Sequence, residues 1–423
     1  MMRATKDSGF EWIGETPASW GLYKGKYMFA QRNLRGNTIE LQLLSPTQKY
    51  GVVPQSVYED RSGMNAVKLN ENANLSALKT IHKGDFCISL RSFQGGFEYS
   101  EYEGVVSPAY QVFYPIVKVA RGYYKYLFKD SGFIEKMNSY TMTLRDGKNI
   151  AFADFGNTYI PCPPVDEQQR IADFLDAKCA EIDALTADIQ TQIDTLEQYK
   201  RSVITETVTK GLNPNAEMKD SGIEWVGQMP MSWSTVPNKY LMYKIKSICP
   251  IYNGENILSL TTNGVIIRDL NGGGKMPTSF DGYQKIVPGN LLMCLFDIDV
   301  TPRCIGLIKD IGLTSPAYSQ FAMKNGAYAP YYYYYYLMVD YTKELLHMAK
   351  NLRHSLTEDQ LGAIKAPRPP YDEQIQIAEY LDSKCSEINQ VIADKNNQLT
   401  TLDKYKKSLI FEYVTGKKEV PAS

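Results

Sequence analysis

Residues 161–183 read PCPPVDEQQRIADFLDAKCAEID, and residues 367–389 read PRPPYDEQIQIAEYLDSKCSEIN, so one motif occurs twice at an offset of 206. A second motif also occurs twice. Residues 6–20 read KDSGFEWIGETPASW and residues 219–233 read KDSGIEWVGQMPMSW, with ten of the fifteen positions identical. Two copies at this long spacing predict two copies of a whole domain plus its connector, that is, a pseudo-two-fold internal repeat.

Each copy of the longer motif opens a segment with the pattern of a long helix. Large apolar residues recur every seven positions over residues 175–203 and again over 381–409, where Lys395 is the exception. Such a heptad pattern is typical of a coiled coil. The intervening positions of the apolar seam are expected to hold Ile171, Leu185 and Tyr199 in the first helix and Ile377, Val391 and Tyr405 in the second.

The ends of both helices are also marked in the sequence. Proline pairs precede them, and Asp166 and Asp372 are expected to cap the first turns. Gly211 and Gly416 are expected to end them. A helix of about 44 residues is about 66 Å long and cannot bury its apolar stripe alone, so the two helices are expected to pack together. Lys395 would then either fix the register of the seam or extend out of it.

Length and composition indicate a globular protein of two or three domains, with 423 residues, 43% hydrophobic and 22% charged. No apolar run reaches the roughly 18 residues of a membrane span, and the N-terminus lacks the apolar core of a signal peptide. The seven cysteines are scattered without a CxxC pair. We therefore expect a cytoplasmic protein with reduced thiols and no membrane association.

The net charge of −1 conceals blocks of opposite sign. Residues 21–160 carry 17 Lys and Arg against 12 Asp and Glu, and residues 234–366 carry 13 against 10. The two helical segments, 165–211 and 371–423, are acidic. Basic blocks suit a polyanion such as nucleic acid, although an excess this small is also compatible with charge scatter.

The basic blocks contain short apolar runs between Gly, Pro and Asn, which indicates strands and turns beside a few helices. The predicted fold class is therefore mixed α/β (α+β), with two globular domains joined by two long helices. The predicted segments are an N-terminal repeat box (1–20), a first domain (21–164), a central helix (165–211), a linker with the second box (212–233), a second domain (234–370), a distal helix (371–416) and a tail (417–423).

Motifs of catalysis are missing from the sequence. There is no Walker or GxSxG motif, no aminomethyltransferase signature, and no histidine–cysteine spacing for a metal. We therefore predict no catalytic residues, no metal site and no cofactor bound by this chain.

Two loops in the basic blocks have the composition of DNA-reading surfaces. Residues 89–100 combine Arg, Ser, Gln and aromatic residues around a Gly-Gly pair, and residues 297–309 place an arginine after a proline. Arginine and glutamine can read guanine and adenine edges in the major groove. The candidate DNA contacts, each of which could instead be an ordinary loop residue, are Arg91, Ser92, Gln94, Tyr110, Arg145, Lys148, Arg268, Lys275, Arg303, Tyr318 and Arg353.

Six consecutive tyrosines at 331–336 correspond in position to Tyr123, Tyr124 and Tyr126 of the first block. Base stacking is one interpretation. Six in a row cover every face of a helix, however, so helix packing is the favoured interpretation.

The arrangement as a whole resembles the specificity subunit of type I restriction–modification systems. The resemblance rests on the KDSGxEWxGxxPxSW and PxPPxxEQxxIAxxLDxK boxes, each present twice in the right order, with divergent blocks between them. It covers essentially the whole chain.

The resemblance implies a function and a set of partners. Each variable block would be a target recognition domain that reads half of a bipartite double-stranded DNA site, and antiparallel helices would set the spacer. Two methyltransferase subunits, with S-adenosylmethionine, would methylate adenine, and restriction subunits would use ATP and Mg. Partner contacts would lie on Asp166, Glu167, Gln168, Asp372, Glu373 and Gln374, whose simpler role is helix capping.

Two other classes of function compete with this one. A self-contained restriction and methylation enzyme would need the catalytic motifs that are missing. A scaffold with two protein-binding domains would show no salt-dependent DNA binding.

Overall fold

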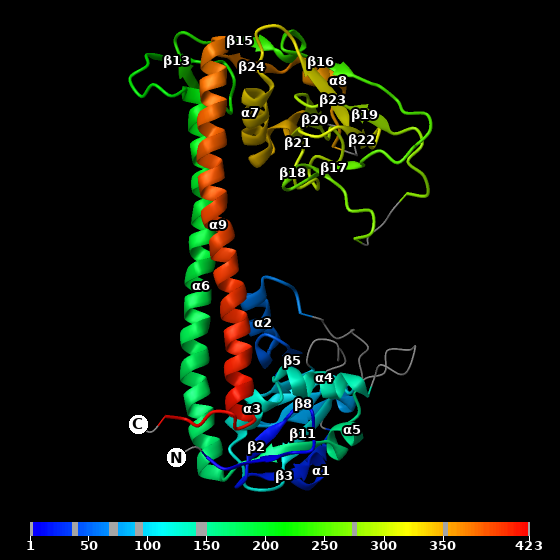
Figure 1. Ribbon diagram of the computed structural model, residues 1–423, viewed down its shortest axis with the longest axis vertical. Coiled ribbons are helices and arrows are strands. Elements are labelled where there is room, and N and C mark those ends of the chain that lie inside the picture. Colours follow the sequence, from blue (N-terminus) through cyan, green and yellow to red (C-terminus); the bar gives the residue numbers. More distant parts are fainter. Residues whose placement is uncertain are drawn as a thin grey trace. The chain divides into compact units, whose positions relative to one another are not determined.

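The computed structural model of the chain describes residues 3–35, 41–66, 75–88, 96–140, 150–272, 277–349 and 354–421. The chain forms two compact units (Figure 1). The first comprises residues 1–189 and 397–423, and the second comprises residues 190–396. Each unit therefore combines one globular block with parts of both long helices.

The first unit is organised around a four-stranded antiparallel sheet in the order β4-β11-β8-β9. Its strands are β4 (Phe29–Arg32), β11 (Gln111–Pro115), β8 (Phe86–Ile88) and β9 (Phe97–Tyr99). Strand pairs surround it: β1 (Thr5–Asp7) with β2 (Glu15–Pro17), β3 (Gly21–Lys24) with β12 (Tyr159–Cys162), β5 (Leu44–Thr47) with β6 (Gly51–Pro54), and β7 (Lys79–Ile81) with β10 (Gly104–Val106). The short helices are α1 (Gly25–Met28), α2 (Gln55–Ser62), α3 (Arg121–Leu127), α4 (Ser131–Ser139) and α5 (Phe152–Asn157).

The second unit repeats this topology with a sheet in the order β16-β23-β20-β21. Its strands are β16 (Met242–Ile245), β23 (Ser319–Met323), β20 (Leu291–Met293) and β21 (Ile305–Leu307). The surrounding pairs are β13 (Met218–Asp220) with β14 (Gln228–Pro230), β15 (Ser234–Pro237) with β24 (Lys365–Arg368), β17 (Leu258–Thr261) with β18 (Gly264–Ile267), and β19 (Gln284–Ile286) with β22 (Gly312–Thr314). Its helices are α7 (Ala329–Tyr341) and α8 (Glu358–Ala363). The prediction that the divergent blocks share one mixed fold is confirmed.

The two cores are filled differently although the topology is the same. In the first unit Phe29 lies at the centre of an aromatic cluster, with Phe86, Phe113 and Phe128 at ring-centroid distances of 5.9, 5.7 and 5.6 Å. In the second unit aliphatic and sulphur-containing side chains such as Leu291 fill the sheet side of the core. Because a core mainly needs the right volume and pattern of apolar groups, one topology tolerates both solutions.

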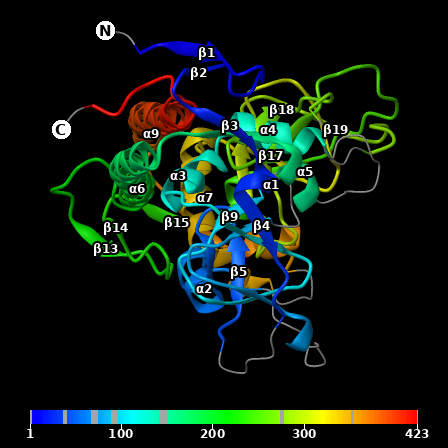
Figure 2. The same cartoon turned by 90° about the horizontal axis from the view of Figure 1, so that it is seen from below.

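The two long helices are α6 (Val165–Lys210) and α9 (Tyr371–Val414), and they pack against each other in both units (Figures 1 and 2). In the first unit Lys406 Nζ lies 2.6 Å from Asp183 Oδ1. In the second unit Lys200 Nζ lies 3.0 Å from Asn389 Oδ1. As the α6 residue number rises, its α9 partner's number falls, so the helices pair antiparallel.

The seam between these helices differs in part from the prediction. Positions 175, 182 and 189 are buried as expected, but Leu185 and Tyr199 are 47% and 50% exposed. Their counterparts Val391 and Tyr405 are exposed as well. At the start of each helix the predicted second positions, Ile171 and Ile377, are buried. Further along, the buried second positions include Cys179, Ile193 and Cys385, which lie four residues after a heptad position and not three, so the prediction is wrong there.

Lys395 lies in the seam and donates a hydrogen bond from Nζ to Oε1 of Gln192 on the facing helix. Of the two roles left open by the sequence, this contact supports the one in which Lys395 takes part in helix pairing.

The two helices begin at Val165 and Tyr371. Asp166 and Asp372 therefore lie inside the first turn and are not the capping residues, although their charge still favours a helix N-terminus. The predicted glycine stops are confirmed, with φ of 73° at Gly211 and 78° at Gly416.

The ends of the long helices are held by the repeat boxes. A Cβ on Gly416 would lie 2.3 Å from Pro17 Cδ, and a Cβ on Gly211 would lie 3.2 Å from Trp233 Cζ2. Lys417 Nζ also donates to Ile13 O, 2.8 Å away. The N-terminal box therefore lies against the end of α9 in the first unit, and the second box lies against the end of α6 in the second unit.

Candidate nucleic-acid interface

Each globular block is fixed to the helices by the same set of tyrosine hydroxyls. Tyr123 donates to Val414 O at 2.6 Å in the first unit, and Tyr331 donates to Val208 O at 3.0 Å in the second. Tyr126 donates to Asp176 Oδ1 at 2.6 Å (Figure 2 shows α3 beside the helices), and Tyr334 donates to Asp382 Oδ1 at 2.7 Å. The helix-packing interpretation of the tyrosine run is confirmed.

These hydroxyls remain neutral donors. Burial raises the pKa of Tyr123 and Tyr331 well above the usual value, and nearby carboxylates and hydroxyls add to the effect. A neutral phenol can donate to a backbone carbonyl, whereas a phenolate could not. The tyrosines therefore act as permanent anchors for the blocks.

The two loops predicted to read DNA occupy the same place in the two sheets. Residues 89–100 cover the connection from β8 to β9, and residues 297–309 cover the connection from β20 to β21. The two loops share no sequence motif. The two loops therefore connect equivalent strands of the repeated fold but differ in amino-acid sequence.

Seven of the predicted DNA contacts lie outside the described residues. They are Arg91, Ser92, Gln94, Arg145, Lys148, Lys275 and Arg353. The remaining four, discussed next, are Tyr110, Arg268, Arg303 and Tyr318.

Tyr110 and Tyr318 are equivalent residues at the turns before β11 and β23. Each backbone N–H donates to the serine carbonyl three residues earlier, Ser107 and Ser315. Tyr110 packs against the small apolar cluster around Val112. Tyr318 stacks on Phe296 with ring centroids 6.2 Å apart, and burial raises its pKa. Both rings are half-buried and take part in packing.

Arg268 and Arg303 lie on different segments of the second unit. Arg268 follows strand β18, and its backbone N–H donates to Ile257 O at 2.7 Å. The Arg303 guanidinium binds three groups of the protein itself, the carbonyls of Ile305 and Thr262 and the hydroxyl of Tyr333. Arg303 thus donates from three of its nitrogens to groups of the same unit.

The β20–β21 loop is held in place by residues that the sequence analysis did not single out. Lys343 Nζ donates to Thr301 O at 2.7 Å, and Asp340 Oδ2 accepts from Cys304 N at 2.8 Å. His354 Nδ1 lies 2.9 Å from Asp299 Oδ2, and this hydrogen bond lowers the Asp299 pKa. In the sequence, the feature that could have indicated this role is Asp340, an acidic residue in a helix that otherwise consists mainly of tyrosines and aliphatic residues.

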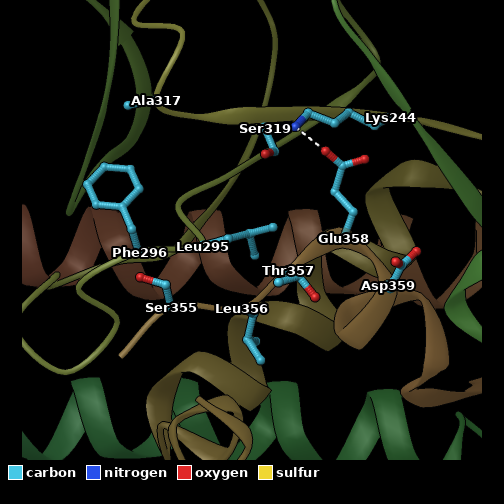
Figure 3. Close-up of a pocket in the computed structure, with 10 residues that line it drawn as sticks. All are labelled: Lys244, Leu295, Phe296, Ala317, Ser319, Ser355, Leu356, Thr357, Glu358 and Asp359. Carbon is cyan, nitrogen blue, oxygen red and sulfur yellow. Dashed lines mark hydrogen bonds and ion pairs between the residues drawn. The ribbon is translucent and has the colours of Figure 1, made fainter. Parts of the chain in front are cut away.

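A pocket of about 500 Å³ lies next to this loop (Figure 3). Phe296 stands on one side of it, and the ion pair of Lys244 with Glu358 stands on the other. Ser319, Ser355 and Thr357 add hydroxyl groups to its wall. The pocket thus combines an aromatic face with polar groups, and it lies in the unit's variable block.

The residues predicted to bind partner subunits divide into two groups. Asp166 and Asp372 are exposed. Glu167 and Glu373 instead accept from the indole Nε1 of Trp20 and Trp233, at 3.1 and 2.9 Å, which fixes the repeat boxes to the helix starts.

Gln168 and Gln374, also predicted to contact partners, are fully buried and so do not present their side chains to solvent. Gln168 Oε1 accepts from Ala120 N at 2.9 Å while its Nε2 donates to Pro163 O at 2.8 Å. Gln374 makes the equivalent bonds to Tyr328 N and Pro369 O. Each glutamine satisfies backbone groups where the block meets the helix.

Across the seven described stretches of chain, no group of three or more His, Cys, Asp and Glu side chains is arranged to hold a metal ion. Within the same stretches, none of the helices has the length and apolar character that crossing a membrane would require. The structure thus presents loops and anchors, and the comparisons with known proteins bear on what they do.

Residues 25–195 match the family model of the type I restriction modification DNA specificity domain. The chain is 27% identical to the type I restriction enzyme MjaVIII specificity subunit of Methanocaldococcus jannaschii over 303 residues, which are 66% of this chain and 67% of that protein. It is 26% identical to the putative MjaX specificity subunit of the same organism over 279 residues, 61% of this chain, and spans 59% of that relative's length.

Solved structures share the fold. A chain from a structure of the complex assembly and conformational transition of the type I R-M system matches with a TM-score of 0.69 at 14% identity, covering 95% of this chain and 99% of that one. The HsdS subunit from Thermoanaerobacter tengcongensis matches with a TM-score of 0.51 at 15% identity, covering 97% and 100%. Residues 25–195 thus match a type I restriction modification DNA specificity domain, and the chain is similar over 66% of its length to a type I restriction enzyme specificity subunit.

Proposed function

We propose that this chain reads a bipartite double-stranded DNA target, one half with each unit, and directs the chemistry of partner subunits to it. One observation carries the proposal: the anchors that fix the blocks to the helices are the same in both units, while the loops on the equivalent sheets differ. Constant anchors suit a partner that binds twice. Divergent loops suit two different half-sites, because sequence is read by side chains at base edges.

The partners would be two methyltransferase subunits, which bind S-adenosylmethionine and methylate adenine, and restriction subunits that use ATP and Mg. The chain itself would act in the cytoplasm without a catalytic residue, metal or cofactor of its own. Its exposed acids Asp166 and Asp372, at equivalent helix starts, are the remaining candidates for equivalent partner contacts.

The deciding experiment is methylome sequencing of host cells with and without this chain. We expect one bipartite adenine-methylated motif, with a fixed unread spacer, that disappears when the chain is removed. A methylome that does not depend on the chain would contradict the proposal. Methyl transfer by the purified chain alone would favour a self-contained enzyme, and absence of salt-dependent DNA binding by the assembled complex would favour a protein scaffold.

A double substitution tests the assignment of one unit to one half-site. Arg91→Ala with Gln94→Ala is expected to change or abolish recognition of the half-site read by the first unit, because these residue types read guanine and adenine edges. The other half-site should be unchanged in the mapped motif. Equal loss of recognition at both half-sites would contradict the assignment of one half-site to each unit.

A further inference from the structure

Arg303 makes three hydrogen bonds that join three elements of the second unit. Its Nη1 donates to Thr262 O at 2.6 Å, its Nε donates to Ile305 O at 3.0 Å, and its Nη2 donates to the Tyr333 hydroxyl. The guanidinium also lies over the Tyr333 ring, 5.6 Å from its centroid. A guanidinium is a rigid planar fork, so bonds from three of its nitrogens fix its orientation.

The joined elements are the turn of the β17–β18 hairpin, the start of β21 and helix α7. Thr262 lies in the hairpin turn, which Gly264 completes with a φ of 97°. Tyr333 lies on α7, whose neighbouring tyrosines bind α6 and α9 within the same unit. Arg303 therefore links the hairpin turn to the most firmly anchored helix of the unit.

A second feature brings the hairpin close to the sheet at the same place. A Cβ on Gly306 of β21 would lie 2.5 Å from Val265 Cγ2 and 2.8 Å from Leu260 Cδ1, both on the hairpin. Only glycine permits this approach, because neighbouring atoms are not seen so close to a real Cβ. Arg303 and Gly306 thus fix the same hairpin by independent means, one by hydrogen bonds and the other by the absence of a side chain.

The segments that Arg303 holds together expose side chains to solvent. Ile266 and Ile267 on the hairpin are 41% and 47% exposed, and Val300 in the β20–β21 loop is 73% exposed. Apolar side chains can contact the methyl group of thymine, and a two-stranded ribbon fits the major groove. A DNA-reading surface built from both segments would need their relative position fixed in advance.

We infer that Arg303 is a positioning residue that holds the β17–β18 hairpin beside the β20–β21 loop, so that both read DNA as one preformed surface. The inference rests on the proposed function and replaces the sequence-based assignment of Arg303 as a DNA contact. The bonds to Thr262, Ile305 and Tyr333 occupy three of the five N–H donors of the guanidinium, so only the remaining two could contact a phosphate or a guanine. As long as Arg303 keeps these three bonds, it acts as a brace, that is, it holds the β17–β18 hairpin against the start of β21 and helix α7.

The test compares variants of the full chain, assembled with its methyltransferase subunits, on a duplex carrying the target found by methylation mapping. Arg303→Met keeps the stem and removes the donors, and Arg303→Lys keeps the charge without the fork. Gly306→Ala displaces the hairpin without changing any charge. Lys365→Met removes one charge from an exposed residue of the same unit, on strand β24 outside both segments, and serves as the control.

The readouts are affinity for the target, discrimination at each base pair of the second half-site, and the slope of log affinity against log salt. We expect Arg303→Met, Arg303→Lys and Gly306→Ala each to weaken binding by about tenfold or more and to reduce discrimination across several base pairs. The salt slope should stay that of the parent chain, because no phosphate contact is lost.

The opposite pattern would overturn the inference. If Arg303 contacts a phosphate, Arg303→Met should reduce the salt slope by about 0.9 and Arg303→Lys should bind nearly like the parent. If Arg303 reads a base, discrimination should fall at a single base pair and Gly306→Ala should not reproduce it.

Hydrogen exchange gives a readout that does not depend on DNA. Backbone amides of residues 258–267 should exchange faster in Arg303→Met and Gly306→Ala than in the parent chain, whereas the amides of α7 should keep their protection. Unchanged exchange in the hairpin would contradict the role of Arg303 in holding it. If the parent complex binds no specific DNA, the proposed function fails while this measurement still decides whether Arg303 holds the hairpin. Should Arg303→Met fail to fold, Arg303→Lys and Gly306→Ala provide the same comparison.

Discussion

At the scale of single residues, Glu98 is a carboxylate buried in the first unit beside Lys129, whose Nζ lies 2.6 Å from its Oε1. Burial raises the Glu98 pKa to about 7 from 4.5, although the Lys129 charge acts in the opposite direction. Burial likewise raises the pKa of Asp130 to about 6, against the backbone N–H groups that it accepts from. The folded unit therefore binds more protons than the unfolded chain between about pH 4.5 and pH 7.

Because the folded unit binds more protons than the unfolded chain, the free energy of unfolding of the first unit should fall as pH rises from about 4.5 to about 7. The stability is fully present below the unfolded pKa and is lost as pH passes the folded pKa, by up to about 3 kcal/mol for Glu98. Glu98→Gln should flatten the dependence of the first unit's free energy of unfolding on pH, measured by urea titration from about pH 5 to pH 8. Glu11→Gln, on an exposed residue, should leave the slope unchanged. A parent-like slope in Glu98→Gln would contradict the assignment.

Gln168 offers a second test at this scale. Gln168→Ala should cost about 2–3 kcal/mol of unfolding free energy, because it leaves Ala120 N–H and the Pro163 carbonyl without partners in a buried place. The neighbouring Gln169 is exposed, and Gln169→Ala should change stability by less than about 0.5 kcal/mol. Unchanged stability of Gln168→Ala together with lost assembly with methyltransferase subunits would restore the interpretation of Gln168 as a partner contact.

At the scale of elements, Lys395 is the polar member of an otherwise largely apolar seam, bonded to Gln192 of α6. A polar seam residue usually lowers stability while specifying the register. Lys395→Leu should therefore raise the thermal midpoint of the second unit by a few degrees, a stabilisation of about 1 kcal/mol. Gln390→Leu, on an exposed position of α9 in the same unit, should give no such gain. A lower midpoint for Lys395→Leu would show that the polar pair stabilises the helices.

The antiparallel register sets the condition for testing the helices as a ruler for the spacer. Seven residues inserted after Ile189 lengthen α6 by about 10.5 Å and preserve the heptad phase, provided that a matching insertion follows Gln398 in α9. The paired insertion should lengthen the unread spacer of the methylated motif by about three base pairs, at 3.4 Å each, and keep both half-sites. An insertion in α6 alone should shift pairs such as Lys200 with Asn389 out of register and abolish methylation. An unchanged spacer in an active paired variant would remove the ruler role.

At this scale, the sequence predicts the features that depend on one segment of the chain, and it does not predict those that depend on contacts between distant segments. The helix pair, the glycine stops and the packing of the tyrosine run followed from periodicity and local chemistry. The positions of Leu185 and Tyr199 did not, because only the facing helix decides which side of a heptad is covered. The bonds of Arg303 were equally hidden, because Thr262 and Tyr333 come from distant parts of the sequence.

At the scale of the whole molecule, the first unit is assembled from both ends of the chain. Deleting residues 411–423 would remove the acceptor of the Tyr123 hydroxyl, the Tyr413 ring that stacks on Phe174 at 4.5 Å, and the Lys417 contact with the N-terminal box. We expect the truncated chain to show a lowered transition for the first unit and a retained one for the second, by scanning calorimetry with limited proteolysis. Deleting only residues 421–423, which leaves Val420 against the core of the first unit, should have little effect. Equal loss in both units would contradict the independent construction of the units.

The same construction has a consequence for biosynthesis. The second unit is one uninterrupted stretch, residues 190–396, whereas the first needs residues 397–423, which are made after the second unit. Domains usually fold in the order in which they are made, N-terminal first. Here we expect the order to reverse: residues 1–189 emerge first, but their surface for the end of α9 stays uncovered until residues 397–423 have been made. Protease protection of stalled nascent chains, appearing in the second unit before the first, would reveal this delay.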